Sequence, residues 1–171
     1  MTIANALKDM PLSPAPFVSS VMQIEPQWID YNGHLNMAYY NVLFDRAVDE
    51  AYELLGIGLD YLKRHNHSTF TAEAHVRYLR ELKDGDPVRV TFQLLDYDDK
   101  RIHYFEQLLH AEEGWLSATS ENMTLHVDMA AKKVVPFPDK VQRSLAAMKA
   151  AHASLPRPDS AGRSIKMPAH T

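Results

Sequence analysis

Apolar side chains recur at steps of three and four residues between Asn36 and Gly56, and this spacing predicts the longest helix of the chain. Most of the acidic side chains in this stretch fall off the apolar stripe. Asn36 stands where a helix cap is expected, and Gly56 and Gly58 supply a stop signal. We expect about five helical turns, roughly 30 Å long, and then a short helix over residues 59–64. The apolar stripe consists of Met37, Tyr40, Phe44, Val48, Ala51 and Leu55.

After Ser68 the period of the pattern changes to two, which is typical of strands. The chain also alternates between Phe17 and Gln27, where Pro26 ends an expected first strand, and a short strand is expected at 134–135. Because consecutive strands joined by tight turns run antiparallel, we expect a predominantly antiparallel sheet. The four long alternating segments cover residues 70–79, 88–94, 101–111 and 115–128.

The pattern divides the chain into three parts. Residues 1–16 form a proline-containing leader, residues 17–152 form one domain, and residues 153–171 form a tail without periodicity that is either flexible or draped over a neighbour. The domain ends in a helix that Asp139 is expected to cap. At 171 residues the chain suits a single core. The leader carries apolar residues that can pack on the surface, namely Ile3, Leu7, Met10 and Leu12.

The predicted elements give an α+β fold in which the long helix covers one face of a curved sheet. A single helix cannot cover a broad sheet, and the second faces of the strands still carry apolar side chains. Such faces and an exposed strand edge favour a homodimer or a dimer of dimers. Alternatively, the terminal helix covers these residues, which are Leu79, Leu95, Phe105, Leu109 and Leu116.

Composition narrows the range of partners. The chain has no cysteine and a net charge of −4, with charges interspersed rather than in blocks, so we expect a cytoplasmic protein that binds a small molecule and neither nucleic acid nor a membrane. No apolar run approaches the roughly 18 residues of a membrane span. The pair His65 and His67 lacks a third ligand nearby, so we expect no metal site.

The densest polar chemistry lies between Trp28 and Tyr40, immediately before and at the start of the long helix. This segment holds a carboxylate, an imidazole, two side-chain amides and three phenols. A helix start offers unpaired N–H groups and the positive end of a dipole, so a carboxylate one turn ahead of it lies beside an electrophile-stabilising position. The alternative is plain turn chemistry at Asp30 to Gly33, with Asn36 as an ordinary helix cap.

The motif Asp30-Tyr-Asn-Gly33-His34-Leu-Asn36, placed before a long helix and a run of long strands, resembles the hotdog-fold acyl-CoA thioesterases of the 4-hydroxybenzoyl-CoA thioesterase branch. The resemblance covers about residues 17–151. It implies a hotdog fold, a long central helix wrapped by a curved antiparallel sheet of five to six strands. It also implies hydrolysis of a small acyl-CoA thioester to the free acid and CoA, without a cofactor because CoA is part of the substrate.

The same resemblance assigns roles to single residues. Asp30 becomes the catalytic carboxylate, either as a nucleophile or as a general base on water. The N–H of Met37 polarises the thioester carbonyl, and Gly33 lets the backbone approach closely. His34 and Asn36 order the loop, and His34 could alternatively act as an acid or base. On the strand after the helix, two residues could complete the pocket across a dimer, Thr71 and Glu73.

The wording of the motif is also similar to thioesterases of carnitine breakdown that act on betainyl-CoA. A trimethylammonium group favours an aromatic cage, and this segment holds four candidate rings, although these can equally be core residues. Two alternative hypotheses for the function remain. One is a non-catalytic acyl-CoA-binding protein, and the other is a hotdog enoyl-CoA hydratase or dehydratase. The Pro-Gly signature of the hydratases is missing after Gly33, and neither chain end has a basic helix-turn-helix pattern. The candidate cage consists of Trp28, Tyr31, Tyr39 and Tyr40.

Overall fold

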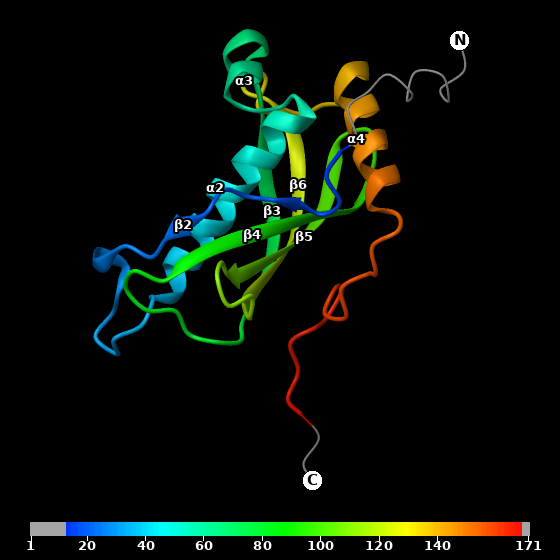
Figure 1. Cartoon of the computed structure of the whole chain (residues 1–171). Coiled ribbons are helices and arrows are strands. Elements are labelled where there is room, and N and C mark those ends of the chain that lie inside the picture. The colour runs from blue at the N-terminus through cyan, green and yellow to red at the C-terminus, as the bar shows by residue number, and fades with distance from the viewer. Residues whose placement is uncertain (1–12, 169–171) are drawn as a thin grey trace.

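The computed structural model describes residues 13–168, which form one antiparallel sheet with helices packed against it. Figure 1 shows the long helix α2 lying across the sheet, with α4 beside the sheet's other end. The elements in chain order are β1 (Phe17–Val18), β2 (Met22–Gln23), the 3₁₀ turn η1 (Pro26–Trp28), α2 (Met37–Leu55), α3 (Leu59–His65), β3 (His67–Tyr78), β4 (Pro87–Tyr97), β5 (Arg101–His110), β6 (Leu116–Asp128), β7 (Lys133–Val134) and α4 (Asp139–His152).

Helix α2 has the ends that its sequence predicts. The Asn36 side chain accepts a hydrogen bond from the N–H of Ala38 at 3.0 Å, which satisfies one of the free donors of the first turn. Gly56 ends the helix in the left-handed conformation, with φ of 77°, which costs least for glycine. The predicted apolar stripe is buried from Tyr40 to Leu55, whereas Met37 at its start is exposed. Local patterning therefore fixes both ends and the buried face of this helix.

The strand order is β1-β4-β5-β6-β3, with β2 also on β4 and β7 on β6, and every pair is antiparallel. The sheet is antiparallel as predicted, but β3 and β4 do not form the expected hairpin. Strand β3 pairs with β6 at the far edge, so residues 79–86 cross the end of the sheet. Buried Leu82 anchors this crossing. Alternation predicts a strand but not its partner, which is why the sequence did not predict the crossing.

The expected first strand is broken into β1 and β2. Ser19 occupies the break, where its hydroxyl accepts a hydrogen bond from the N–H of Val90 at 2.9 Å and its own N–H donates to the Val90 carbonyl at 2.8 Å. The pairing with β4 shifts by one residue between the Phe17–Phe92 pair and the Met22–Val88 pair. A serine side chain thus replaces a backbone partner, and the strand bends around the sheet.

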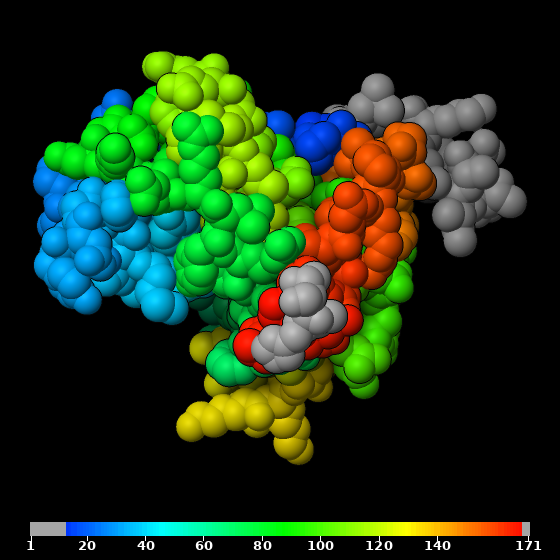
Figure 2. Space-filling view, turned by 90° about the horizontal axis from the view of Figure 1, so that it is seen from below, coloured from blue at the N-terminus to red at the C-terminus, as the bar shows by residue number. Residues whose placement is uncertain are grey.

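Helix α4 and the C-terminal half of α2 share one core cluster with strands β4 and β5. Val141, Leu145 and Met148 of α4 are buried there, as their spacing predicts. The predicted cap is wrong by one residue, because Pro138 is the N-cap and Asp139 is the first helical residue, where its charge suits the helix dipole. In Figure 2, α4 in orange and the blue segment around residues 25–40 lie at opposite sides of the molecule.

The segment after α4 lies against the face of the sheet opposite α2. The Gln93 side chain donates to the Pro156 carbonyl at 3.2 Å, and the N–H of Gly162 donates to Glu121 at 2.7 Å. Phe105 pairs with both Gln93 and Glu121 in the sheet, so this segment passes over it, and Phe105 is only 3% exposed. The chain itself therefore buries part of the apolar face that the sequence left uncovered, while Leu79 stays exposed.

Two expectations concern residues beyond these elements. The leader residues Ile3, Leu7, Met10 and Leu12 lie outside the described residues, as does the end of the tail from residue 169. Among the helices of residues 13–168, none has the length and apolar character needed to span a bilayer.

Candidate functional site

The loop before α2 is held by its own backbone. Residues Ile29 and Leu35 form a bridge, the N–H of Asp30 donates to the His34 carbonyl at 3.0 Å, and the N–H of Gly33 donates to the Asp30 carbonyl at 3.0 Å. Gly33 adopts φ of 80°, a conformation that glycine adopts without strain. The loop is a closed turn that returns the chain to the start of α2.

The Asp30 side chain is half-buried in this loop, and only one of its oxygens is used. Its Oδ1 accepts a hydrogen bond from the N–H of Asn32 at 2.8 Å, which is the turn chemistry expected of an Asp-x-Asn-Gly sequence. The second carboxylate oxygen makes no hydrogen bond within residues 13–168. The turn therefore orients the carboxylate and leaves its second oxygen without a hydrogen bond in the described chain.

The N–H of Met37 is available at the start of α2. The Asn36 side chain accepts a hydrogen bond from the N–H of Ala38, and the Asn36 backbone carbonyl accepts one from the N–H of Tyr39. In the described part of the chain, no acceptor lies against the N–H of Met37, and the Met37 residue is 64% exposed. Because unpaired N–H groups at a helix start carry a partial positive charge, this donor can stabilise an oxyanion.

The Asp30 loop, the start of α2 and the crossing segment 79–86 line a cavity of about 500 Å³ that is open to solvent. The N–H of Leu35 donates to the Leu82 carbonyl at 2.8 Å, and His34 Nε2 lies 3.0 Å from the Glu81 carboxylate, so the crossing holds the loop from outside. The cavity brings together six predicted site residues, and the full lining is Asp30, Tyr31, Asn32, His34, Leu35, Asn36, Met37, Tyr40, Tyr78, Leu79, Arg80 and Glu81.

The four candidate cage rings do not converge. Trp28 is buried and stacks on Tyr39 with ring centroids 5.6 Å apart, while the Arg46 guanidinium lies 5.1 Å from the Trp28 ring. Tyr40 is buried in the core, so the core alternative describes it better, and Tyr31 is 97% exposed. Neither Trp28 nor Tyr39 lines the cavity around Asp30.

Tyr78 is a cavity residue that the sequence did not single out. Its hydroxyl donates to the carbonyl of Met37 at 3.2 Å, and its ring packs edge-on against Tyr40 with centroids 5.0 Å apart. The side chain thus ties the end of β3 to the first turn of α2. The sequence pattern did not indicate a site role for Tyr78, because only the fold brings the end of its strand beside the helix.

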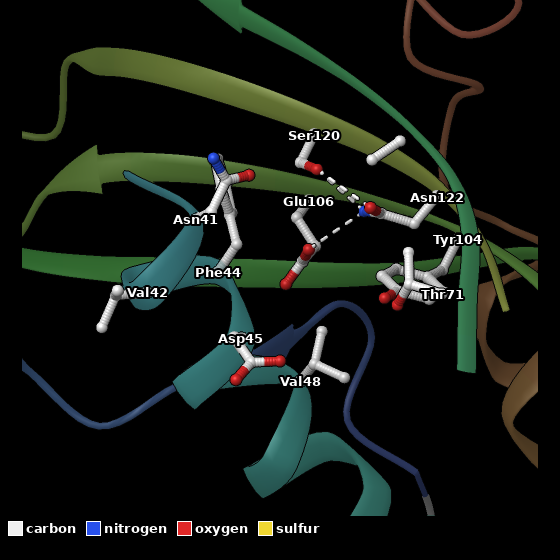
Figure 3. A pocket seen from close by; sticks show the side chains of 11 residues that line it. Asn41, Val42, Phe44, Asp45, Val48, Thr71, Tyr104, Glu106, Ser120 and Asn122 are labelled. Carbon is white, nitrogen blue, oxygen red and sulfur yellow. Dashed lines mark hydrogen bonds between the residues drawn. The ribbon is translucent and has the colours of Figure 1, made fainter. Parts of the chain in front are cut away.

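A second cavity of about 370 Å³ lies further along α2, between this helix and the sheet (Figure 3). Thr71 of β3 lines it, but Glu73 does not. A register shift between Thr71 and Glu73 puts Thr71 and Ala74 on the face toward α2 and turns Glu73 to the other face, beside His103 and Glu121. The bulge therefore separates two residues that regular alternation would place together.

Glu106 of β5 stands inside this second cavity and is 1% exposed. Asn122 Nδ2 donates to one carboxyl oxygen at 3.2 Å, and the other, Oε1, has no hydrogen-bond partner in the described chain. Burial raises the pKa of the Glu106 carboxyl well above its usual range, and the charge of Asp45 adds to the rise. Sequence reasoning missed this residue, although a signal was present. Glu106 interrupts the inward-facing series Ile102, Tyr104 and Leu108.

Among residues 13–168, no group of three or more His, Asp and Glu side chains is arranged to hold a metal ion. The buried histidines have structural contacts instead. His126 Nε2 and the Tyr61 hydroxyl lie 2.9 Å apart, and burial lowers the pKa of His126. The chemistry available at the Asp30 cavity is thus a carboxylate, a helix-start N–H donor and an exposed apolar rim.

The sequence matches a known family over most of its length. Residues 24–145 match the model of the thioesterase-like superfamily. A betainyl-CoA thioesterase of Pseudomonas aeruginosa is 38% identical over 143 residues, covering 84% of this chain and 90% of the relative. An L-carnitine dehydrogenase/betainyl-CoA thioesterase of Rhizobium meliloti is 40% identical over 143 residues, also 84% of this chain. This chain spans only 29% of the length of that relative.

A solved structure gives the same result for the fold. A Staphylococcus aureus protein determined in complex with CoA superposes with a TM-score of 0.84 at 28% identity, covering 94% of this chain and 99% of that one. The α+β hotdog fold expected from the sequence, a long central helix against a large antiparallel sheet, is confirmed. With the match over residues 24–145 and the relatives at 38–40% identity, the chain belongs to the thioesterase-like superfamily.

Proposed function

We propose that the protein is an acyl-CoA thioesterase that hydrolyses a small acyl-CoA thioester to the free acid and CoA. The observation that carries the proposal is the cavity that Asp30 and the start of α2 both line. In the described chain, Asp30 has one carboxylate oxygen without a hydrogen bond and Met37 has an N–H without an acceptor. Thioester hydrolysis needs a nucleophile on one side of the carbonyl and oxyanion stabilisation on the other. The family membership and the thioesterase names of the relatives support the same activity.

The proposed mechanism divides the work between two groups. Asp30 either attacks the thioester carbon to form a mixed anhydride or removes a proton from an attacking water. The N–H of Met37 binds the oxygen that becomes negative, a type of interaction worth about 3 to 4 kcal/mol in other enzymes. The Asn32 N–H and the contact of His34 Nε2 with the Glu81 carboxylate position the loop, so His34 acts as an orienting residue. The thiolate of CoA leaves. On the nucleophilic route water then hydrolyses the mixed anhydride, which releases the free acid and restores Asp30. On the general-base route the proton held by Asp30 passes to the thiolate or to solvent.

The finer proposal concerns the acyl group. Relatives of 38–40% identity are named betainyl-CoA thioesterases, alone in one case and joined to L-carnitine dehydrogenase in another. We take betainyl-CoA as the substrate, with its CoA portion as the only nucleotide group required and no separate cofactor. The absence of cysteine in the sequence remains the ground for expecting a cytoplasmic protein.

The site is proposed to work in a homodimer, with a dimer of dimers as the larger assembly. Strand β3 is a sheet edge of 12 residues, and its residues from Phe70 to Ala74 are exposed. Long exposed edges tend to pair with another chain. This edge borders the cavity between α2 and the sheet, which Thr71 and Ala74 line, so a second copy paired there closes it. Sedimentation equilibrium should give at least twice the mass of one chain, and a monomer at micromolar concentration would overturn this assignment.

A thiol-release assay over a panel of acyl-CoA thioesters tests the activity and the substrate together. Betainyl-CoA, acetyl-CoA, a medium-chain acyl-CoA and 4-hydroxybenzoyl-CoA form a sufficient panel. The expected result is turnover of betainyl-CoA with a kcat/KM far above those of the others. Binding of acyl-CoA without release of free thiol from any member would contradict the enzyme and support a binding protein. Turnover of another member above betainyl-CoA would keep the thioesterase and replace the substrate.

A further inference from the structure

Glu106 is the buried carboxyl group for which the fold supplies no counter-charge. Among residues 13–168 no other Asp or Glu is buried to this degree, and its Oε1 has no partner. Burying a carboxyl group without a counter-charge is costly, and groups with strongly perturbed pKa values cluster at functional sites. In Figure 3 the Glu106 carboxyl reaches from the sheet into the space beside α2, with Asn122 at its other side.

The surroundings of Glu106 suit a cation. Asp45 of α2 faces the same cavity and acts on Glu106 electrostatically. No Lys, Arg or His is among the residues that line this cavity, so neither carboxylate has a positive partner there. The walls include the rings of Phe44 and Tyr104, and aromatic faces attract quaternary ammonium groups. The cavity therefore offers negative charge and aromatic surface but no fixed cation.

The cavity lies within reach of the proposed reaction centre. Asn41, which lines it, is one helical turn beyond Met37, and a turn rises about 5.4 Å. Asp45 is one turn further, but helical side chains lean toward the N-terminus, which brings its carboxylate back toward the level of Asn41. A thioester whose carbonyl oxygen binds the N–H of Met37 can direct a short acyl group into this space.

We infer that Glu106, assisted by Asp45, is the specificity-determining residue of the acyl site and receives a quaternary ammonium group carried by the acyl chain. This inference rests on the proposed thioesterase function and names the part of the protein that selects the substrate. It replaces the aromatic cage expected from Trp28, Tyr31, Tyr39 and Tyr40, whose rings do not surround a common space. Trp28 and Tyr39 stack on each other, Tyr40 packs against Tyr78, and Tyr31 is exposed. The carboxylate pair supplies the charge, and Phe44 and Tyr104 enclose the methyl groups.

The protonation state of Glu106 should make the preference for a cationic acyl group depend on pH. Its raised pKa keeps the empty site protonated at lower pH, and a bound cation favours the ionised form. The ionisable groups facing it are Asp45 and Tyr52 on α2 and Tyr104 on β5, and burial raises the pKa of both phenols, so they stay neutral. The remaining lining residues from β3 and β6 do not titrate. Selectivity for a cationic acyl group should therefore increase as pH rises.

A matched pair of substrates isolates the charge. Betainyl-CoA and 3,3-dimethylbutyryl-CoA have nearly the same shape, because a carbon replaces the charged nitrogen. Glu106→Gln keeps the size of the side chain and an acceptor for Asn122 Nδ2 but cannot become negatively charged when a cation binds. The expected result is a fall of about thirty-fold or more in kcat/KM for betainyl-CoA, with a change under about threefold for the neutral analogue. Asp49→Asn, on the same helix but outside the cavity lining, is the control and should preserve the wild-type ratio.

The outcomes separate the inference from the function on which it rests. If wild type hydrolyses neither of these esters nor any other member of the acyl-CoA panel, the proposed function fails. If wild type hydrolyses acyl-CoA thioesters but does not prefer betainyl-CoA to the neutral analogue, the function stands and the inference is overturned. If wild type prefers the cationic ester and Glu106→Gln keeps that preference, the function stands and the inference is overturned. A wild-type preference that does not rise with pH also overturns it. Circular dichroism of Glu106→Gln should match wild type, and if the variant does not fold, the wild-type pH profile of the preference decides the inference.

Discussion

The cavity around Asp30 and the cavity around Glu106 lie along the same helix but are built in opposite ways. The Asp30 cavity consists of a loop, a helix start and a crossing segment, with exposed side chains such as Tyr31 at its rim. The Glu106 cavity lies between α2 and the middle of the sheet, where Glu106 is almost completely buried. The open loop suits a reaction that must admit a large thioester, and the rigid sheet suits recognition of a small group.

The difference also explains why the two carboxyl groups are held differently. Asp30 uses one oxygen to fix its own turn and stays accessible. Glu106 receives one hydrogen bond from Asn122 and is otherwise enclosed, so burial raises its pKa. A nucleophile or base needs to be ionised and reachable, whereas a recognition group can be stored neutral until its ligand arrives.

The largest effect on stability is expected from the segment that supports the Asp30 loop. Leu82→Ala removes a fully buried side chain from the crossing segment and should lower the free energy of unfolding by about 2 to 5 kcal/mol. Because the Leu82 carbonyl also accepts the N–H of Leu35, the variant should lose thioesterase kcat through loop displacement. Urea unfolding and thiol release measure the two effects.

Leu54→Ala provides the comparison for this variant, because Leu54 is 53% exposed on α2. It should change the free energy of unfolding by less than about 0.5 kcal/mol. Equal destabilisation by the two variants would show that the crossing segment does not anchor the loop. The proposed difference in construction between the two cavities would then fail for the Asp30 cavity.

A smaller, pH-dependent effect is expected at Glu106. Its folded pKa is raised above the unfolded value, so the unfolded chain releases this proton first as pH rises, and wild-type stability falls from about pH 4.5 upward until the folded pKa is reached. Glutamine does not titrate, so the free energy of unfolding of Glu106→Gln, relative to that of wild type, should increase with pH by at most about 1.4 kcal/mol per pH unit. Thermal melts of both proteins between pH 5 and 8 measure the difference. A constant difference would mean that the carboxyl is not held neutral.

The sequence predicted the parts of the structure that local chemistry controls. The cap at Asn36, the stop at Gly56 and the stripe between them gave α2 with its correct ends. The same cap defined the donor at Met37, and turn chemistry at Asp30 gave the loop. Each of these features depends on residues within a few positions of one another, which is the range that a pattern describes.

The parts that the sequence missed depend on residues far apart in the chain. The crossing of residues 79–86, the contact of Tyr78 with Met37 and the bulge that turns Glu73 away all follow from strand order, which alternation does not encode. Glu106 was different, because a carboxyl at an inward position of an apolar strand was visible in the sequence. The role inferred for Glu106 depends on the fold, because only the packing of α2 on the sheet places Asp45 in the same cavity.

The most direct test of the central claim is the turnover of Asp30→Asn in the thiol-release assay. Asparagine keeps the Oδ1 acceptor for the N–H of Asn32, so the turn and the melting temperature should be preserved. The expected loss in kcat is about a thousandfold or more, while the control Asp60→Asn, an exposed position on α3, should keep wild-type turnover. Near-normal hydrolysis by a folded Asp30→Asn protein would contradict the assignment of the reaction to this loop.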